Sequence, residues 1–255
     1  MDMSELFGSG DKNGGALPES RSVTNGIEIA TVVNIKDPKN YGRVKCKYVT
    51  SDKDAGETGW IYCMTPFGGD QYGSFFHPNV GDVVVLAFQH GDIHRPFVIG
   101  RLWTQEVKPP LNVQNGKNEE YKIVTPNQSY LDFVDTKGKE KITLATPKGR
   151  TVLLDDENGQ ISISDGKTSL VMNEQNGTTE ITCDKKLVVK VGTGVTITCD
   201  GTSGAVTIKT NKEVAVSTAQ YSNKASGTSE LSANGSMTVK SSGMLTVKGS
   251  MTKIN

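Results

Sequence analysis

The sequence predicts an all-β protein in two parts, a small barrel followed by a long stack of short strands. The chain has 255 residues and 28 glycines but is only 35% hydrophobic, which is little for one compact core. No segment repeats its apolar residues with the 3.6-residue period of a helix. Short apolar runs separated by Gly, Pro and Asp indicate strands and turns instead. From about residue 121 onward, apolar and polar residues alternate as they do in half-buried strands.

Residues 1–25 are rich in Gly, Ser, Asp and Asn, and we expect a flexible N-terminal arm there. Residues 26–103 hold five short apolar runs, which lie at 27–35, 44–49, 60–64, 83–88 and 97–102. Turn-forming Gly, Pro, Asn and Asp separate these runs, a pattern typical of a small closed barrel of five strands. Residues 104–120 contain Pro109-Pro110, and we expect an extended linker.

Residues 121–255 differ from the barrel in composition. Of the 16 aromatic residues of the chain, only Tyr221 follows Phe133. Apolar centres recur every 7 to 11 residues in most steps, with Gly or Asn between them, so the segment predicts a stacked repeat rather than a globular domain. The centres, which we expect to form the needle core, are Ile142, Val152, Ile161, Leu170, Ile181, Val189, Ile197, Ile208, Val216, Leu231, Val239 and Val247.

The short repeat predicts that several chains share this core. Each repeat holds one strand of about five residues and a turn, so only two or three side chains can face inward. One chain wound on such a repeat could not enclose a core, whereas three chains around one axis could. We therefore expect an intertwined three-chain β-helix, a homotrimeric needle in which each strand pairs with strands of the other two chains. A second β-sandwich or an adhesin-like stalk is the alternative, and the scarcity of aromatic residues argues against a sandwich.

Charge and cysteine content narrow the classes of function. Lys and Arg together number 28, as do Asp and Glu, so bulk charge gives no sign of a nucleic-acid partner. The four cysteines, Cys46, Cys63, Cys183 and Cys199, form no CxxC pair, and free thiols are favoured over a disulfide framework or a zinc site. The N-terminus has no apolar stretch of a signal peptide, and no run approaches the roughly 20 apolar residues of a spanning helix. We expect synthesis in the cytoplasm without a signal peptide.

Residues 26–103 resemble the OB domain of phage baseplate spike proteins and type VI secretion VgrG proteins. The residues that carry this resemblance are Asp37, Pro38, Gly42, Arg43, Trp60, Pro78, Gly81, Asp82, Gly91, Asp92, Arg95, Pro96 and Gly100. The stretch from Leu131 to Thr143 resembles the entry into the family's β-helix, and the ending from Val247 to Asn255 resembles members with a separate tip protein. The resemblance implies a five-stranded OB-type barrel followed by a trimeric β-helix.

The resemblance also implies partners and a mechanical role. VgrG chains carry a large hub module before the OB domain, so here a separate hub protein is implied at the OB end. A separate PAAR-type protein would cap the tip, where a blunt needle end exposes unpaired strand edges. The residues we expect to bind this cap are Met251, Lys253, Ile254 and Asn255. The chain would be the non-enzymatic, cofactor-free central spike of a contractile injection system, which meets a target membrane transiently.

Two features of some family members, a lysozyme domain and a metal site at the tip, are not expected in this chain. The interval between barrel and needle is too short for the lysozyme domain of some phage spikes. All three histidines, His77, His90 and His94, precede residue 95, so the tip metal site of some short spikes is not expected. Whether the particle is a phage tail, a bacteriocin, an extracellular particle or a type VI system stays open.

Other candidate sites have simpler interpretations. His90 and His94 flank a Gly91-Asp92 turn, which favours a solvated loop over a ligand pair. The acidic run Asp155, Asp156 and Glu157 precedes Asn158-Gly159, which favours a turn between needle strands over an acid–base site. Aromatic residues gather at Trp60, Phe67, Tyr72, Phe75 and Phe76, where we expect core packing and contact between subunits rather than a ligand surface. The rival functions are an OB-fold binding protein with an adhesin-like stalk, including a nucleic-acid binder, and a polysaccharide lyase or hydrolase.

Overall fold

A computed structural model describes residues 26–49, 56–113 and 116–253 of the chain. Within these ranges the secondary structure is all β, apart from one turn of 3-10 helix, η1 (Gln89–Gly91). No helix in the described part of the chain is long and apolar enough to cross a membrane. The chain divides into two compact units between Thr182 and Cys183. The N-terminal arm expected at residues 1–25 lies outside the described residues.

The OB region is built on a four-stranded antiparallel sheet in the order β2-β1-β5-β6. Its strands are β1 (Glu28–Asn34), β2 (Lys45–Tyr48), β5 (Val83–Phe88) and β6 (Pro96–Arg101). Alternate residues of β1 and β5 are fully buried, as the period of two requires when one face of a sheet covers a core. That core contains Ala30, Val32, Val44, Cys46, Ile61, Val84, Leu86 and Val98.

Residues 57–64 connect the two outer strands of this sheet. On one side Ile61 exchanges two backbone hydrogen bonds with Val44, at 2.9 and 3.0 Å, and on the other side Met64 N–H donates to Val98 O at 2.7 Å. The sequence predicts a regular strand over residues 60–64, whereas the structure has isolated bridges there. The segment nevertheless lies where the fifth strand of a barrel would lie, hydrogen-bonded to both edges of the sheet.

A small hairpin projects between this segment and β5. It consists of β3 (Gly68–Gly69) and β4 (Tyr72–Gly73). Gly73 has a φ of 139°, and a Cβ there would lie 2.5 Å from the carbonyl oxygen of Phe67. Only glycine therefore fits this position.

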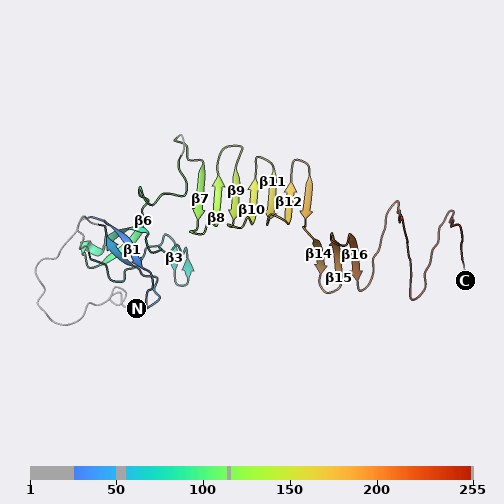
Figure 1. Cartoon of the computed structure of the whole chain (residues 1–255), viewed down its shortest axis with the longest axis horizontal. Helices are drawn as coiled ribbons and strands as arrows, with labels where there is room; N and C mark the ends of the chain where they lie inside the picture. Colours follow the sequence, from blue (N-terminus) through green and yellow to red (C-terminus); the bar gives the residue numbers. More distant parts are fainter. Residues whose placement is uncertain (1–25, 50–55, 114–115, 254–255) are drawn as a thin grey trace, which may run out of the picture. The chain divides into compact units, whose positions relative to one another are not determined.

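A seven-stranded antiparallel sheet, which we call the ladder, follows in strict chain order (Figure 1). Its strands, each of five residues, are β7 (Glu120–Val124), β8 (Tyr130–Val134), β9 (Lys141–Ala145), β10 (Thr151–Asp155), β11 (Gln160–Ser164), β12 (Ser169–Asn173) and β13 (Thr178–Thr182). Turns of four to six residues join them, and glycines with positive φ such as Gly149 (78°) supply the tight bends.

The second unit contains a three-stranded antiparallel sheet, formed by β14 (Lys186–Val191), β15 (Val195–Asp200) and β16 (Ala205–Thr210). Residues 211–253 contain no strand. The prediction that each needle strand pairs with other chains is wrong for the inner strands β8–β12 and β15, because these strands pair on both sides with their own neighbours in the chain. Turns this short make hairpin pairing the nearest solution for consecutive five-residue strands. Intertwined pairing stays a prediction for residues 211–255.

Candidate functional site: an uncovered apolar sheet face

The strand register gives the ladder one apolar face. Residues opposite each other in an antiparallel pair point to the same side of the sheet, as do residues two apart in one strand. One row of this face contains Ile123, Leu131, Leu144, Val152, Ile163, Leu170 and Ile181. The adjacent row contains Tyr121, Phe133, Ile142, Leu154, Ile161, Met172 and Thr179. Thr179 is the one polar residue in the two rows.

Among the described residues of the first unit, no other segment covers this apolar face. Leu144 is 54% exposed, Ile163 52% and Ile181 53%. The apolar residue of the ladder that is buried, Ala145, lies on the opposite face. A contiguous run of exposed apolar side chains such as this one marks an interaction site.

The opposite face of the ladder is mainly polar, although Val124, Val134, Leu153 and Val171 also lie on it, and it carries ion pairs between neighbouring strands. Lys122 Nζ lies 3.3 Å from Asp132 Oδ2, and Lys141 Nζ lies 3.1 Å from Asp155 Oδ2. Hydrogen bonds from Asn158, and then from Lys141, lower the pKa of Asp155. Hydrogen bonds to Asp155 and Glu157 raise the pKa of Lys141. Asp155 and Ser162 on this face are already buried, at 6% and 9% exposed, so the more exposed apolar face is the one that needs a partner.

The three-stranded sheet, like the ladder, has one apolar face and one mainly polar face. One of its faces presents Leu187, Val189, Val191, Val195, Ile197, Cys199, Val206 and Ile208. The other face presents mainly polar residues together with Val188 and Ala205, and there Lys186 Nζ lies 2.6 Å from Asp200 Oδ2. Both sheets therefore need a partner for one face only.

The predicted needle-core residues fall into two groups. Eight lie on the two apolar faces, namely Ile142, Val152, Ile161, Leu170, Ile181, Val189, Ile197 and Ile208. The other four, Val216, Leu231, Val239 and Val247, lie outside any strand and are at least 66% exposed. The predicted core residues begin at Ile142 and leave out the first two strands, although Leu131 and Phe133 alternate with polar residues in the same way.

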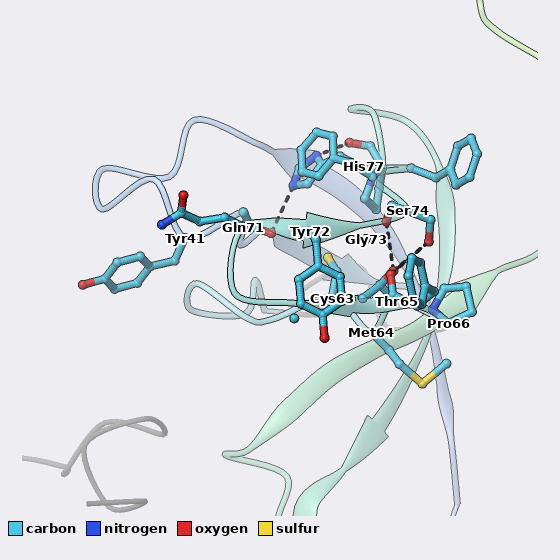
Figure 2. Close-up of a pocket in the computed structure, with 17 residues that line it drawn as sticks. Tyr41, Cys63, Met64, Thr65, Pro66, Gln71, Tyr72, Gly73, Ser74 and His77 are labelled. Carbon is cyan, nitrogen blue, oxygen red and sulfur yellow. Dashed lines mark hydrogen bonds between the residues drawn. The ribbon is translucent and has the colours of Figure 1, made fainter. Parts of the chain in front are cut away.

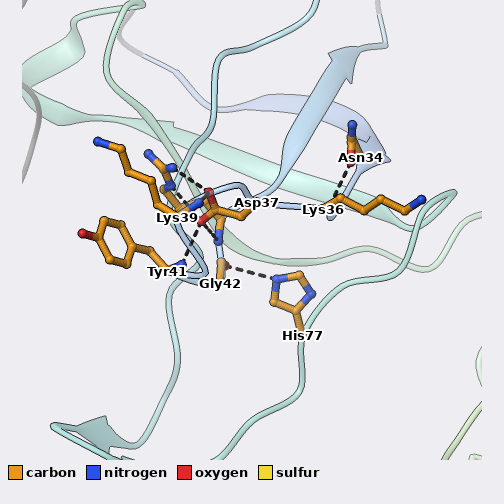
Figure 3. A network of polar contacts seen from close by, with 8 residues as sticks. Asn34, Lys36, Asp37, Lys39, Tyr41, Gly42 and His77 are labelled. Atoms are coloured by element: carbon orange, nitrogen blue, oxygen red, sulfur yellow. Dashed lines mark hydrogen bonds and ion pairs between the residues drawn. The ribbon is translucent and has the colours of Figure 1, made fainter.

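Two residues of the OB motif, Asp37 and Arg43, form a charged turn (Figure 3). The Asp37 carboxylate accepts hydrogen bonds from the backbone N–H groups of Lys39 at 3.0 Å and Tyr41 at 2.9 Å. It also accepts from Arg43 Nε at 3.0 Å and from Nη2 at 2.6 Å. The guanidinium bonds are the largest cause of the low pKa of Asp37, and backbone N–H bonds add to it. The role of these residues is to fix the turn before β2.

The other motif residues lie mainly at the ends of strands. Gly81, with a φ of 95°, and Asp82 form the turn before β5, where Asp82 Oδ2 accepts from Asn79 N–H at 2.9 Å. Arg101 lies 3.5 Å from Asp82 and also donates to the carbonyl oxygen of Phe76. The ring of Trp60 lies 5.4 Å from Lys45 Nζ. Pro38, Gly42, Pro78, Gly91, Asp92 and Arg95 lie in loops or turns, and Pro96 and Gly100 lie in β6.

Four residues of the aromatic cluster, Phe67, Tyr72, Phe75 and Phe76, lie on and beside the β3–β4 hairpin and line an open cavity of about 590 Å³, whereas Trp60 does not line it (Figure 2). Phe67 and Tyr72 are each 64% exposed, Phe76 is 65% exposed and Phe75 82%. The prediction that these rings pack in the core is therefore wrong, because the hairpin carries them outside the barrel. Their expected contact between subunits stays a prediction. His77 ties this loop to the charged turn, with Nε2 3.1 Å from Gly42 O.

The other candidate histidines and acidic residues lie mainly in turns. His90 lies in the 3-10 turn with a φ of 54°, and His94 lies in the exposed turn that follows. Asp156, Glu157 and Asn158 form the turn between β10 and β11, while Asp155 ends β10. All four cysteines are free. Met251 and Lys253 are exposed and outside any strand, and Ile254 and Asn255 lie outside the described residues.

Comparison with known proteins agrees with this architecture. Residues 28–103 match the family model for the type VI secretion system/phage-baseplate injector OB domain. The chain is 27% identical over 157 residues to the type VI secretion system spike protein VgrG3 of Vibrio cholerae, a match that covers 57% of this chain and 15% of the relative. It is 27% identical over 149 residues to the spike protein VgrG1b of Pseudomonas aeruginosa, covering 53% of this chain and 20% of the relative. The aligned part is thus between about a seventh and a fifth of each of these two relatives.

Proposed function

We propose that this chain, a VgrG-like relative whose residues 28–103 form an injector OB domain, is the structural central spike of a contractile injection system. In this role it transmits force from the baseplate to a target envelope and performs no catalysis. The observation that carries the proposal is the uncovered apolar face of the ladder. The three-stranded sheet has an apolar face of the same kind.

Three copies of the ladder provide a cover for that face. Each ladder would form one wall of a three-walled prism, with Leu144, Ile163 and their neighbours inside and the ion-paired face in water. Burying apolar surface contributes roughly 25 cal/mol per Å², so enclosing three such faces stabilises the assembly strongly. Seven strands at a spacing of about 4.8 Å give a prism of roughly 30 Å. Residues 211–255 would then wind between the three chains as the distal needle.

The ends of this shaft would carry the partners. The OB end would meet a separate hub protein, and the other end a PAAR-type tip protein through Met251, Lys253, Ile254 and Asn255. The names of the two relatives support the spike role, since both are called spike proteins. The charge balance of the chain gives no support to a nucleic-acid partner.

Multi-angle light scattering on the purified full chain tests the proposal. A trimer would have three times the chain mass of 27.4 kDa, about 82 kDa. A folded, monodisperse monomer would exclude the shared core and favour the alternative, an OB-fold binding protein with an adhesin-like stalk. Glycan turnover by the purified protein would contradict the non-catalytic part of the proposal.

A further inference from the structure

The turns of the ladder form two rows of opposite charge. Because every connection is a hairpin, successive turns alternate between the two lateral edges of the sheet (Figure 1). We call residues 135–140, 156–159 and 174–177 the acidic row, and residues 125–129, 146–150 and 165–168 the basic row. The acidic row has five carboxylates and two lysines, and the basic row has three cations and one carboxylate.

Backbone hydrogen bonds make the acidic row continuous. Asp156 N–H donates to Glu140 O at 3.0 Å, and Glu174 N–H donates to Gly159 O at 2.8 Å. Its charges are only partly paired within the chain. Glu157 binds Lys139 at 3.0 Å and Lys141 at 3.2 Å. No ion pair within the described residues engages Glu140, Asp156 or Glu174.

The cations of the basic row are similarly available. Lys148, Arg150 and Lys167 are exposed, and none of them forms an ion pair within the described residues. The one carboxylate in this row, Asp165, accepts backbone N–H bonds from Lys167 at 3.0 Å and Thr168 at 2.7 Å. Those bonds are the main cause of its low pKa, with a smaller contribution from Arg150.

We infer that the acidic row of one chain packs beside the basic row of a second copy, and that this contact aligns the chains in parallel. The inference rests on the proposed trimeric prism. Rotation about a shaft axis sets the left edge of each wall against the right edge of the next, which is a heterologous contact that closes into a ring. Each acidic row then faces a basic row.

The vertical positions of the charges also match. At equal height, the turn with Lys148 lies between the levels of Glu140 and Asp156 of the neighbouring copy, and the turn with Lys167 lies between those of Asp156 and Glu174. Each offset is one strand spacing of about 4.8 Å. The long stems of lysine and arginine can span it.

The two charged rows favour the parallel orientation, because an inverted chain would place its rows beside rows of the same charge on its neighbours. If one wall turns end over end with its apolar face still inward, its two edges exchange places. Its basic row then faces another basic row, and its acidic row another acidic row. Like-charge contacts of this kind reject the wrong arrangement, whereas the apolar face alone would accept both.

Charge reversal in the full chain tests the inference. The basic-row variant is Lys148→Glu with Lys167→Glu, the acidic-row variant is Asp156→Lys with Glu174→Lys, and a third variant combines all four changes. After refolding at low salt, sedimentation velocity measures the concentration at which half the chains are assembled. We expect each single-row variant to need at least about tenfold more protein than the wild type, and the combined variant to regain assembly. Far-UV circular dichroism checks that each variant keeps its sheets.

Measurements at high salt and the oligomeric state of the wild type distinguish a failure of the charge contact from a failure of the trimer. High salt should remove most of the difference between the variants, because it screens exposed charges. A trimeric wild type whose single-row variants assemble normally would overturn the charge contact and leave the prism intact. A combined variant as defective as the single-row variants would also overturn it. A monomeric wild type would instead refute the proposed function itself.

Discussion

Arg43 donates two hydrogen bonds to the Asp37 carboxylate, from Nη2 to Oδ1 at 2.6 Å and from Nε to Oδ2 at 3.0 Å. The two side chains close a turn in which the same carboxylate also accepts three backbone N–H groups. Asp37 is only 7% exposed. Loss of Arg43 would therefore leave a buried carboxylate without its ion pair, and loss of the Asp37 carboxylate would leave several N–H donors without an acceptor.

We expect Asp37→Asn to lower the thermal stability of the OB domain at pH 7. The folded-state pKa of Asp37 is lowered, chiefly by Arg43, so its contribution is present above the unfolded pKa of about 3.9 and is lost as the pH falls below it. The stability difference between wild type and variant should therefore shrink in acid. Trp60 and Trp103, the two tryptophans of the chain, report OB unfolding by fluorescence at pH 7 and pH 3. Asp70→Asn, in the exposed hairpin turn, is the control.

Leu86 is fully buried in the OB core, and Leu86→Ala should leave a cavity. We expect the free energy of unfolding to fall by about 2–5 kcal/mol. Denaturant titration followed by tryptophan fluorescence measures this loss. Val80→Ala, at a side chain that is 58% exposed, should change it by less than about 0.5 kcal/mol. Equal effects of the two substitutions would contradict the assigned core.

Ile163 and Ser164 are neighbours in β11 that point to opposite faces of the ladder. Ile163→Asp places a charge on the apolar face and should prevent assembly, because a buried unpaired carboxylate is strongly unfavourable. Ser164→Asp places the same charge on the polar face and should leave the trimer unchanged. Light scattering distinguishes the two. Loss of assembly in both variants would show that the effect does not depend on the face.

Three of the four cysteines, Cys46, Cys63 and Cys199, should differ in alkylation. Burial raises the pKa of Cys46 to about 12 and that of Cys63 to about 11, so both should react at pH 8 only after unfolding. Cys199 lies on the apolar face of the three-stranded sheet and should be protected in the trimer but reactive in any monomeric preparation. Mass spectrometry of labelled peptides identifies each site. Rapid labelling of Cys199 in the intact trimer would place that face outside the shared core.

The alternation of residues determined much of this architecture. Because side chains in a strand point to opposite faces with a period of two, the spacing at Ile142, Val152 and Ile161 already assigned these residues to one face. Glycines in the intervening turns indicated where the strands end. The uneven composition, with aromatic residues almost confined to the first 133 positions, separated the OB region from the repeat.

Only the tertiary structure decided which strands pair. A period of two specifies which face of a strand a side chain occupies, but it does not specify what the backbone at either edge of the strand pairs with. With Ile142 on an inward face, its strand could therefore hydrogen-bond to its own chain or to another chain. Hairpin pairing of β9 with β10 resolved that choice for residues 141–155. The exposed position of Phe75 depended likewise on a hairpin that carries the ring away from the barrel, which composition does not specify. Sequence thus determined the two faces of each strand, and long-range packing and pairing decided what each edge and face contacts.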